Sequence, residues 1–153
     1  MVIDDAAMSG LHSVRGVIRR QLRHWNIEEL ADDAALIVTE LLGNAFRHGR
    51  PPVRAWLIRD ESADRTALWI GVSDAGPAVD IGLLRAKWRH PSGSLSTDGR
   101  GLRLVDALAR SWGDQPGVRG HTVWAELDGE GRRHEGGRRQ RSEENRASSI
   151  AVP

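Results

Sequence analysis

The sequence predicts an α+β fold, a two-layer α/β sandwich whose mixed, mostly antiparallel sheet carries helices on one face. Two segments with the helical spacing of apolar residues, 10–24 and 31–48, precede two short β-favouring runs, 53–59 and 66–73. The polar segment 60–64 between these runs predicts a hairpin, and therefore antiparallel pairing. The apolar face of the second helix is wide enough to pack against the resulting sheet.

Composition narrows the possible classes of protein. A chain of 153 residues with 39% hydrophobic residues can build one domain with a core, which we place at residues 10–128. The formal net charge of +1 gives no indication of direct nucleic-acid binding. No run reaches the roughly 20 apolar residues of a membrane span, and no signal peptide is recognisable, so we expect a cytoplasmic protein without membrane contact. Because cysteine is absent, a metal would need oxygen or nitrogen ligands.

Both ends of the chain lack apolar periodicity. We expect residues 1–9 to form a flexible leader. Residues 129–153 are rich in Gly, Arg, Glu and Ser and cannot bury a core, so we expect a disordered charged tail. The arginines of this tail are solvated in the simpler interpretation, and an electrostatic docking arm is the alternative.

The first helix, 10–24, combines an apolar face with an arginine-rich one. Its apolar positions are Leu11, Val14, Ile18 and Leu22, followed by Trp25. The arginine face is either solvated or a surface for a partner. The sequence does not separate core packing of this helix from a homodimer contact.

The second helix carries polar groups along the edge of its apolar face. Asn26 and the acids after it supply N-terminal signals, and Gly49 ends the helix. Glu40, Asn44 and His48 recur every four residues and therefore lie in one row. A carboxylate, an amide oxygen and an imidazole in one row can bind a hard cation such as Mg²⁺, and the carboxylate can act as a base. A solvated helix edge is the equally simple alternative.

The second β-run predicts a carboxylate that faces inward. Leu68, Ile70, Val72 and Asp74 share one face by the two-residue period. A buried carboxylate is costly unless hydrogen-bond donors reach it. Gly76 lies in the turn that follows, where it would let a ligand approach the backbone closely.

A glycine-rich loop follows in the second half of the chain. We expect a short helix at 81–88, a loop at 90–101 and a clear helix at 102–109. A loop with Gly99 and Gly101 that enters a helix presents free N–H groups suited to phosphate. A simple turn is the commoner meaning of such a glycine pair.

The domain ends in one turn-rich segment and one strand. Residues 110–118 are turn-rich, with Trp112 as the anchor of a strand. Residues 121–127 alternate and predict the final strand. The predicted order is therefore helix, helix, strand, strand, loop, helix, strand, strand.

Three motifs in this order resemble those of the GHKL ATP-binding domain, the Bergerat fold of gyrase and histidine kinases, and within it the small anti-sigma factor serine kinases. Thr39-Glu-Leu-Leu-Gly-Asn-Ala-Phe-Arg-His48 looks like the N box, Asp74-Ala-Gly76 like the first glycine box and Gly99-Arg-Gly-Leu102 like the second. His121-Thr-Val-Trp124 is similar to the closing strand, where the family has a Thr near adenine. The resemblance covers about residues 10–127.

The resemblance implies ATP and Mg²⁺ as cofactors and assigns roles to the motif residues. Asn44 would coordinate Mg²⁺, and Glu40 would activate the hydroxyl of a protein serine. Asp74 would accept a hydrogen bond from the adenine amino group, with Gly76 making room for the base. These roles require Asn44 and Asp74 to open onto one pocket. The phosphate cradle would consist of Gly99, Arg100, Gly101 and Leu102.

The remaining assignments are less direct. Thr122 would lie near adenine, and His48 would either approach a phosphate or cap its helix. Pro77-Ala78 follows Gly76 where the family usually has a second glycine, which leaves the lid geometry open. His12, His24 and His90 have no acidic residue after them, so a complete sensor kinase is disfavoured.

The resemblance implies an ATP-dependent protein serine/threonine kinase that phosphorylates a serine of an antagonist protein and regulates a sigma factor. The expected partners are therefore that antagonist and the sigma factor, with homodimerisation left open. A nucleotide-dependent regulatory module without turnover is the alternative, and Glu40 favours the kinase because a pure binder needs no base. An unrelated α+β domain, which would not bind ATP with Mg²⁺, is the third hypothesis.

Overall fold

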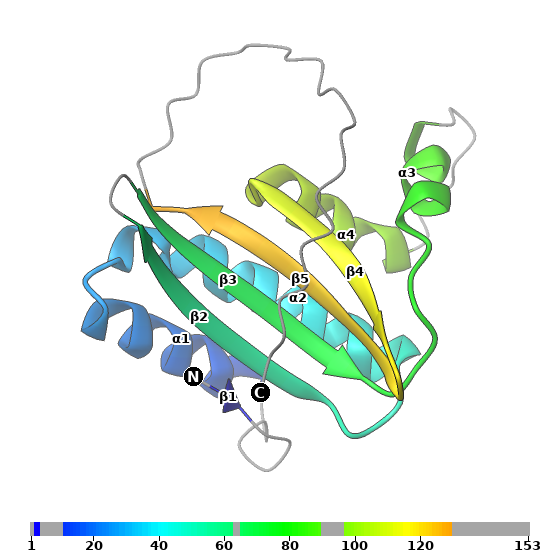
Figure 1. Cartoon of the computed structure of the whole chain (residues 1–153), viewed down its shortest axis with the longest axis horizontal. Helices are drawn as coiled ribbons and strands as arrows, with labels where there is room; N and C mark the ends of the chain where they lie inside the picture. Colours follow the sequence, from blue (N-terminus) through cyan, green and yellow to red (C-terminus); the bar gives the residue numbers. More distant parts are fainter. Residues whose placement is uncertain (1, 4–10, 63–64, 90–96, 130–153) are drawn as a thin grey trace.

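The computed structural model describes residues 2–3, 11–62, 65–89 and 97–129 (Figure 1). The helices are α1 (Leu11–His24), the 3-10 turn η2 (Glu28–Leu30), α2 (Ala31–His48), α3 (Ile81–Arg89) and α4 (Thr97–Leu108). The strands are β1 (Val2–Ile3), β2 (Arg54–Ser62), β3 (Arg65–Asp74), β4 (Ser111–Gly117) and β5 (Gly120–Asp128).

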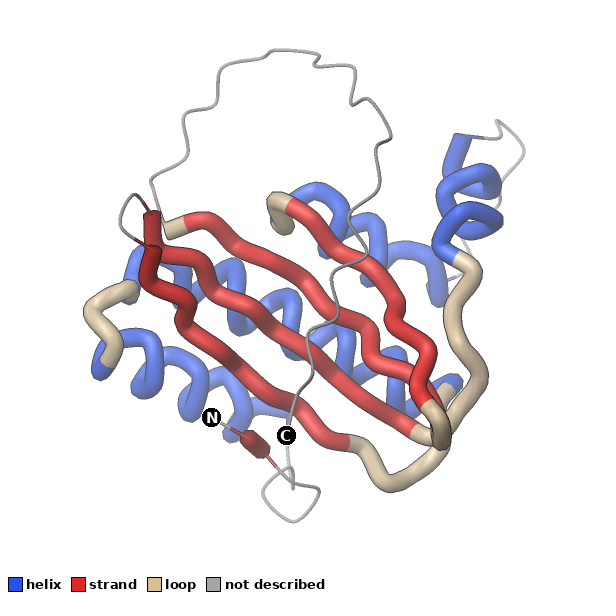
Figure 2. Tube along the Cα trace, viewed as in Figure 1, coloured by secondary structure: helices blue, strands red, loops and turns tan. Residues whose placement is uncertain are grey.

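The strands form one sheet in the order β1-β2-β3-β5-β4. Helices α1, α2 and α4 lie behind this sheet, and its other face carries no helix from the described residues (Figures 1 and 2). The predicted α+β sandwich with helices on one face is therefore confirmed. All described strand pairings are antiparallel, where we expected a mixed sheet, because β2–β3 and β4–β5 are hairpins and β5 also pairs antiparallel with β3.

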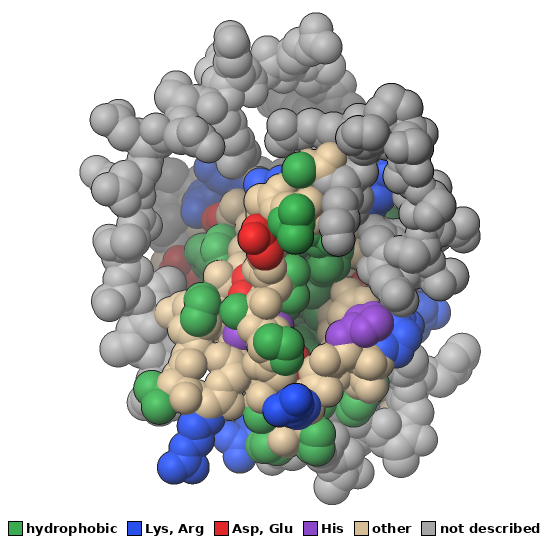
Figure 3. Space-filling model, turned by 90° about the vertical axis from the view of Figure 1, so that its right-hand side faces the viewer, with side chains coloured by type: hydrophobic (Ala, Val, Ile, Leu, Met, Phe, Trp, Pro, Cys, Tyr) green, Lys and Arg blue, Asp and Glu red, His purple; other side chains and the backbone are tan. Residues whose placement is uncertain are grey.

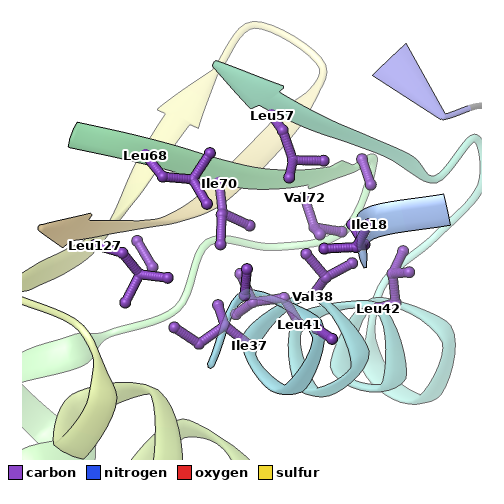
Figure 4. Packing of buried hydrophobic residues seen from close by; sticks show 14 of the residues in the cluster. Ile18, Ile37, Val38, Leu41, Leu42, Leu57, Leu68, Ile70, Val72 and Leu127 are labelled. Atoms are coloured by element: carbon purple, nitrogen blue, oxygen red, sulfur yellow. The ribbon is translucent and has the colours of Figure 1, made fainter. Parts of the chain in front are cut away.

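The core lies between α2 and the inner face of the central strands. Figure 4 shows Ile37 and Leu41 of α2 below Leu68, Ile70 and Val72 of β3, and all five side chains are buried. Each such side chain stabilises the fold by about 1.5–3 kcal/mol when it leaves water. The apolar positions of the two long helices for which burial is described are buried, apart from the partly buried Trp25 just after the first helix: Val14, Ile18, Leu22, Leu30, Ala34, Ile37, Leu41, Leu42 and Ala45.

Helix α4 begins earlier than the sequence indicated. We predicted a loop over 90–101, but the structure is helical from Thr97, and residues 90–96 lie outside the described ranges. Each glycine inside a helix costs about 1 kcal/mol relative to alanine. Burial of Leu102 and Val105 on the core outweighs this cost, so packing decides where the helix starts.

Strand β4 and the short strand β1 also differ from the prediction. The segment predicted to be turn-rich forms a regular edge strand. Its sequence has a low β-propensity, but pairing with β5 along its whole length stabilises the extended conformation. Val2 and Ile3, expected in the leader, pair with β2. The rest of the leader and residues 130–153 of the expected tail lie outside the described residues. No helix in the described ranges is long and apolar enough to cross a bilayer.

Candidate functional site

Asp74 ends β3 on its inner face and is only 7% exposed. Its Oδ1 accepts hydrogen bonds from the backbone N–H of Gly76 at 2.6 Å and of Arg50 at 3.2 Å. Its Oδ2 lies 3.2 Å from Nε2 of His121. Backbone N–H donors from two separate segments therefore satisfy Oδ1, and Nε2 of His121 lies within ion-pair distance of Oδ2.

Two glycines make the space for this carboxylate. A Cβ at Gly49, where α2 ends, would lie 2.4 Å from Cγ of Asp74, and a Cβ at Gly76 would lie 2.6 Å from its Oδ1. We expected Gly76 to make room for a ligand. The structure instead places it behind Asp74, where it admits the carboxylate and does not line the cavity described below.

His121 joins Asp74 to a second buried carboxylate. It is 7% exposed and lies opposite Asp74 in the β3–β5 register, and its Nδ1 is hydrogen-bonded to Oδ1 of Asp114 on β4. The other oxygen of Asp114 accepts a hydrogen bond from the backbone N–H of Val79 at 2.9 Å.

Our sequence interpretation missed both His121 and Asp114. A signal for His121 was present, because it alternates in step with the inward-facing Val123, Ala125 and Leu127. No comparable signal existed for Asp114, since its segment was predicted to be turn-rich.

A cavity of about 280 Å³ opens between the C-terminal end of α2 and the inner face of β3 and β5. Figure 3 looks onto this end of the molecule, where hydrophobic side chains lie in a hollow flanked by histidine side chains. The polar residues that line the cavity are Asn44, His48, Asp74 and His121. Its apolar lining is Leu41, Ala45, Val72, Pro77, Ala78, Val79, Leu102 and Val123. The expectation that Asn44 and Asp74 share one pocket is thus confirmed.

Asn44 keeps part of its hydrogen-bonding capacity unused. Its Oδ1 accepts a hydrogen bond from Arg47 at 3.0 Å. Its Nδ2 is buried and has no partner among the described residues. An unpaired buried amide is costly, so this side chain is suited to a further polar ligand.

Glu40 lies one turn before Asn44 on α2 but does not line the cavity. Its carboxylate packs against α4, where a Cβ at Gly101 would lie only 2.4 Å from Oε2. The glycine at 101 therefore makes room for the Glu40 carboxylate. This contact links the row on α2 to the first turns of α4.

The predicted phosphate cradle has a different form from the loop that we expected. Gly99, Arg100 and Gly101 lie in the first turns of α4, and Leu102 lines the cavity. The reason is the early start of α4 described above. A helix end can still present N–H groups to an anion.

Thr122, predicted near adenine, lies on the opposite face of the sheet. Its Oγ1 is 2.8 Å from Oγ of Ser73, which also faces away from the helices. Successive side chains of a strand point to opposite faces, so the inward place on β5 belongs to His121. The placement of Thr122 therefore corrects our assignment.

The residues present fit a magnesium ion only in combination with a ligand. The described part of the chain contains no group of three or more His, Asp or Glu side chains that could hold a metal ion. Mg²⁺ is commonly bound by one or two protein groups together with substrate phosphates and water. The side-chain oxygen of Asn44 and the carboxylate of Glu40, one turn earlier on α2, are the oxygen ligands that such a site uses.

The chain was compared with models of protein families, with curated proteins and with solved structures. A family model described as "Histidine kinase-like ATPase domain" matches residues 5–126. None of the curated proteins matches the chain. Among solved structures, the histidine kinase domain of the blue-light activated histidine kinase from Erythrobacter litoralis EL346 is similar, with a TM-score of 0.44 and 19% identity. The match covers 80% of this chain and 66% of that one, just under two thirds of its length.

Proposed function

This chain belongs to the histidine kinase-like ATPase family, and from that premise we propose that it is a cytoplasmic protein serine/threonine kinase of the anti-sigma factor type. It transfers the γ-phosphate of ATP to a serine of a small antagonist protein and thereby regulates a sigma factor. Membership of the family implies ATP binding. The protein substrate, the sigma factor and the cellular compartment belong to the proposal.

One observation carries the proposal: Asn44 of the N box and Asp74 of the first glycine box line the same cavity. Asp74 offers a fixed acceptor for the amino group of a base. Asn44 offers its side-chain oxygen, the kind of ligand that would hold Mg²⁺ together with the phosphates of the nucleotide, and a buried Nδ2 donor that has no partner in the described residues. When bound, Mg²⁺ neutralises phosphate charge in the transition state.

Glu40 is the base in this proposal. The serine oxygen forms a bond to the γ-phosphorus, the bond to the β–γ bridging oxygen breaks, and ADP leaves. The proton of the serine passes to the Glu40 carboxylate. Positioning dominates the catalysis of phosphoryl transfer, so one base beside a well-placed nucleotide suffices.

A second function, nucleotide-dependent regulation without turnover, is favoured by one feature of the site. The Glu40 carboxylate packs against Gly101 of α4 and does not line the cavity. A base must come within hydrogen-bond reach of the attacking hydroxyl. In this alternative, nucleotide binding only controls the docking of a partner.

Labelled phosphate transfer separates the two functions. The wild-type protein, Glu40→Gln and the charge-matched control Glu29→Gln, at an exposed position of η2, are incubated with γ-labelled ATP, Mg²⁺ and a candidate antagonist protein. We expect phosphoserine with wild type and with Glu29→Gln, and transfer at least about 100-fold slower with Glu40→Gln. ATP affinity should stay within about threefold in all three.

Each contrary result has a different meaning. Wild-type protein that binds ATP but transfers no phosphate supports the regulatory module. Full transfer by Glu40→Gln removes Glu40 from its role. Wild-type protein that does not bind ATP contradicts both functions.

A further inference from the structure

The segment 77–79 forms one wall of the cavity and leads directly into α3. All three of its residues line the cavity. The backbone N–H of Val79 donates to Oδ2 of Asp114 at 2.9 Å, which fixes the end of the wall to β4. Asp80 then caps α3, because its Oδ1 accepts a hydrogen bond from the N–H of Leu83 at 2.8 Å. The wall and the helix are therefore continuous, and a shift of α3 would move the wall.

A single polar side chain joins the described part of α3 to its neighbours. Arg85 is the only residue of 81–86 with a polar side chain, and its Nη2 donates to Oδ1 of Asp106 on α4 at 2.9 Å. Its guanidinium lies 5.2 Å from the ring centre of Trp112 on β4, within cation–π distance. Nε1 of Trp112 donates to the same Oδ1 of Asp106 at 2.7 Å. These three residues form the α3 anchor, which holds this peripheral helix to α4 and β4 (Figure 1).

The anchor also leads to a second wall of the cavity. Asp106 lies four residues after Leu102 on α4, so the two side chains share one face of the helix. Leu102 is buried and lines the cavity, whereas Arg85 does not line it. We propose that Arg85 is a positioning residue, which holds the wall 77–79 at the distance from α4 that nucleotide binding requires. This role rests on the proposed ATP binding.

The anchor sets the orientation of α3 and adds little to the stability of the fold. Ile81 and Leu84 are partly buried against the core, but apolar contact is non-directional and fixes no orientation. The side chains of Arg85 and Asp106 are 43% and 42% exposed, and exposed ion pairs contribute little to folding. Loss of Arg85 should leave the protein folded with the wall less often in place, which lowers the apparent affinity for nucleotide.

A double-mutant cycle with two nucleotides tests this role. Dissociation constants of ATP and ADP are measured by calorimetry for wild type, Arg85→Met, Asp106→Asn and the double variant, with Arg20→Met on an exposed position of α1 as the matched control. Arg85→Met should bind both nucleotides about fivefold more weakly, because the wall adjoins Asp74 and not the phosphates. Arg20→Met should bind as wild type does. The thermal midpoint of Arg85→Met should fall by no more than about 3 °C.

The cycle also shows whether Arg85 acts through Asp106. Asp106→Asn should lose a smaller factor, because its amide oxygen can still accept from Arg85 and Trp112. The double variant should bind no more weakly than Arg85→Met, since both changes act on one contact.

Three results would overturn the inference. They are wild-type affinity in Arg85→Met, a loss for ATP without a loss for ADP, and a double variant whose loss is the product of the two single losses. An ATP loss alone would place Arg85 at the γ-phosphate, and a product would show that it does not act through Asp106. A wild-type protein that binds neither nucleotide contradicts the proposed function, which is distinct from all three.

Discussion

The two ends of the cavity are built in different ways. At the end where the proposal places the nucleotide base, Asp74 and His121 have partners in the connection after α2, in the turn after β3 and on β4, and they lie within ion-pair distance of each other. At the phosphate end, Asn44 has a buried Nδ2 without a partner in the described residues, and Glu40 meets α4 at a glycine. The residues at the base end, Asp74 and His121, lie on strands of the sheet. Those at the phosphate end, Asn44 and Glu40, lie on α2, and Glu40 contacts α4.

This difference separates stability from function. A satisfied buried network contributes to folding, so a change at the base end should lower both stability and nucleotide affinity. An unsatisfied amide and a carboxylate over a glycine contribute little to folding. Changes at the phosphate end should therefore lower function alone, because the ligand completes that end.

The largest effect is expected from Gly101→Ala. The new Cβ would lie 2.4 Å from Oε2 of Glu40 and would displace the carboxylate. A displacement of about 1 Å can cost about 100-fold in rate, so we expect phosphoryl transfer to fall about 100-fold. The thermal midpoint should not fall, because alanine favours a helix interior over glycine. Transfer at the wild-type rate would show that Glu40 works from another position.

Asp74→Asn should come next and should affect both properties. The amide keeps the shape of the carboxylate but weakens the contacts with His121 and the two backbone N–H groups. Hydrogen bonds of charged groups contribute about 1.5–3 kcal/mol, so ATP affinity should fall about 30-fold and the free energy of unfolding by about 2 kcal/mol. Denaturant titration and calorimetry measure the two. A loss of affinity at unchanged stability would break the comparison.

Asn44→Ala should weaken function at no cost in stability. It removes a buried donor that has no partner, so the free energy of unfolding should stay within about 0.5 kcal/mol of wild type. Affinity for ATP should fall about tenfold with Mg²⁺ present and hardly change in its absence. Titration with and without the ion provides the measurement. An equal loss in both conditions would remove Asn44 as a metal ligand.

The smallest effect is expected from Thr122→Val, on the open face of the sheet. The change removes the hydrogen bond to Ser73, which contributes about 1 kcal/mol to stability. ATP affinity should stay within about twofold, because the side chain faces away from the cavity. A large loss of affinity would restore the adenine contact that the motif suggested for Thr122.

The contrast between Thr122 and His121 shows what the motif could predict: it identified the strand, but not which of its side chains faces the cavity. The closing strand was recognised correctly, and its alternation assigns His121 to the inner face together with Val123 and Leu127. The resemblance pointed to the threonine and the periodicity to the histidine. The register that sets His121 opposite Asp74 agrees with the periodicity.

Local patterns alone determined much of this protein. The apolar face of α2, the row from Glu40 to Asn44 and the inward position of Asp74 follow from spacing, because neighbours along a helix or strand are set by its geometry. Only the tertiary structure decided that α4 starts at Thr97, that Glu40 meets Gly101, and that Asp114 holds His121. These contacts join residues that lie on different elements, and they depend on packing and strand register, which no single stretch of sequence encodes.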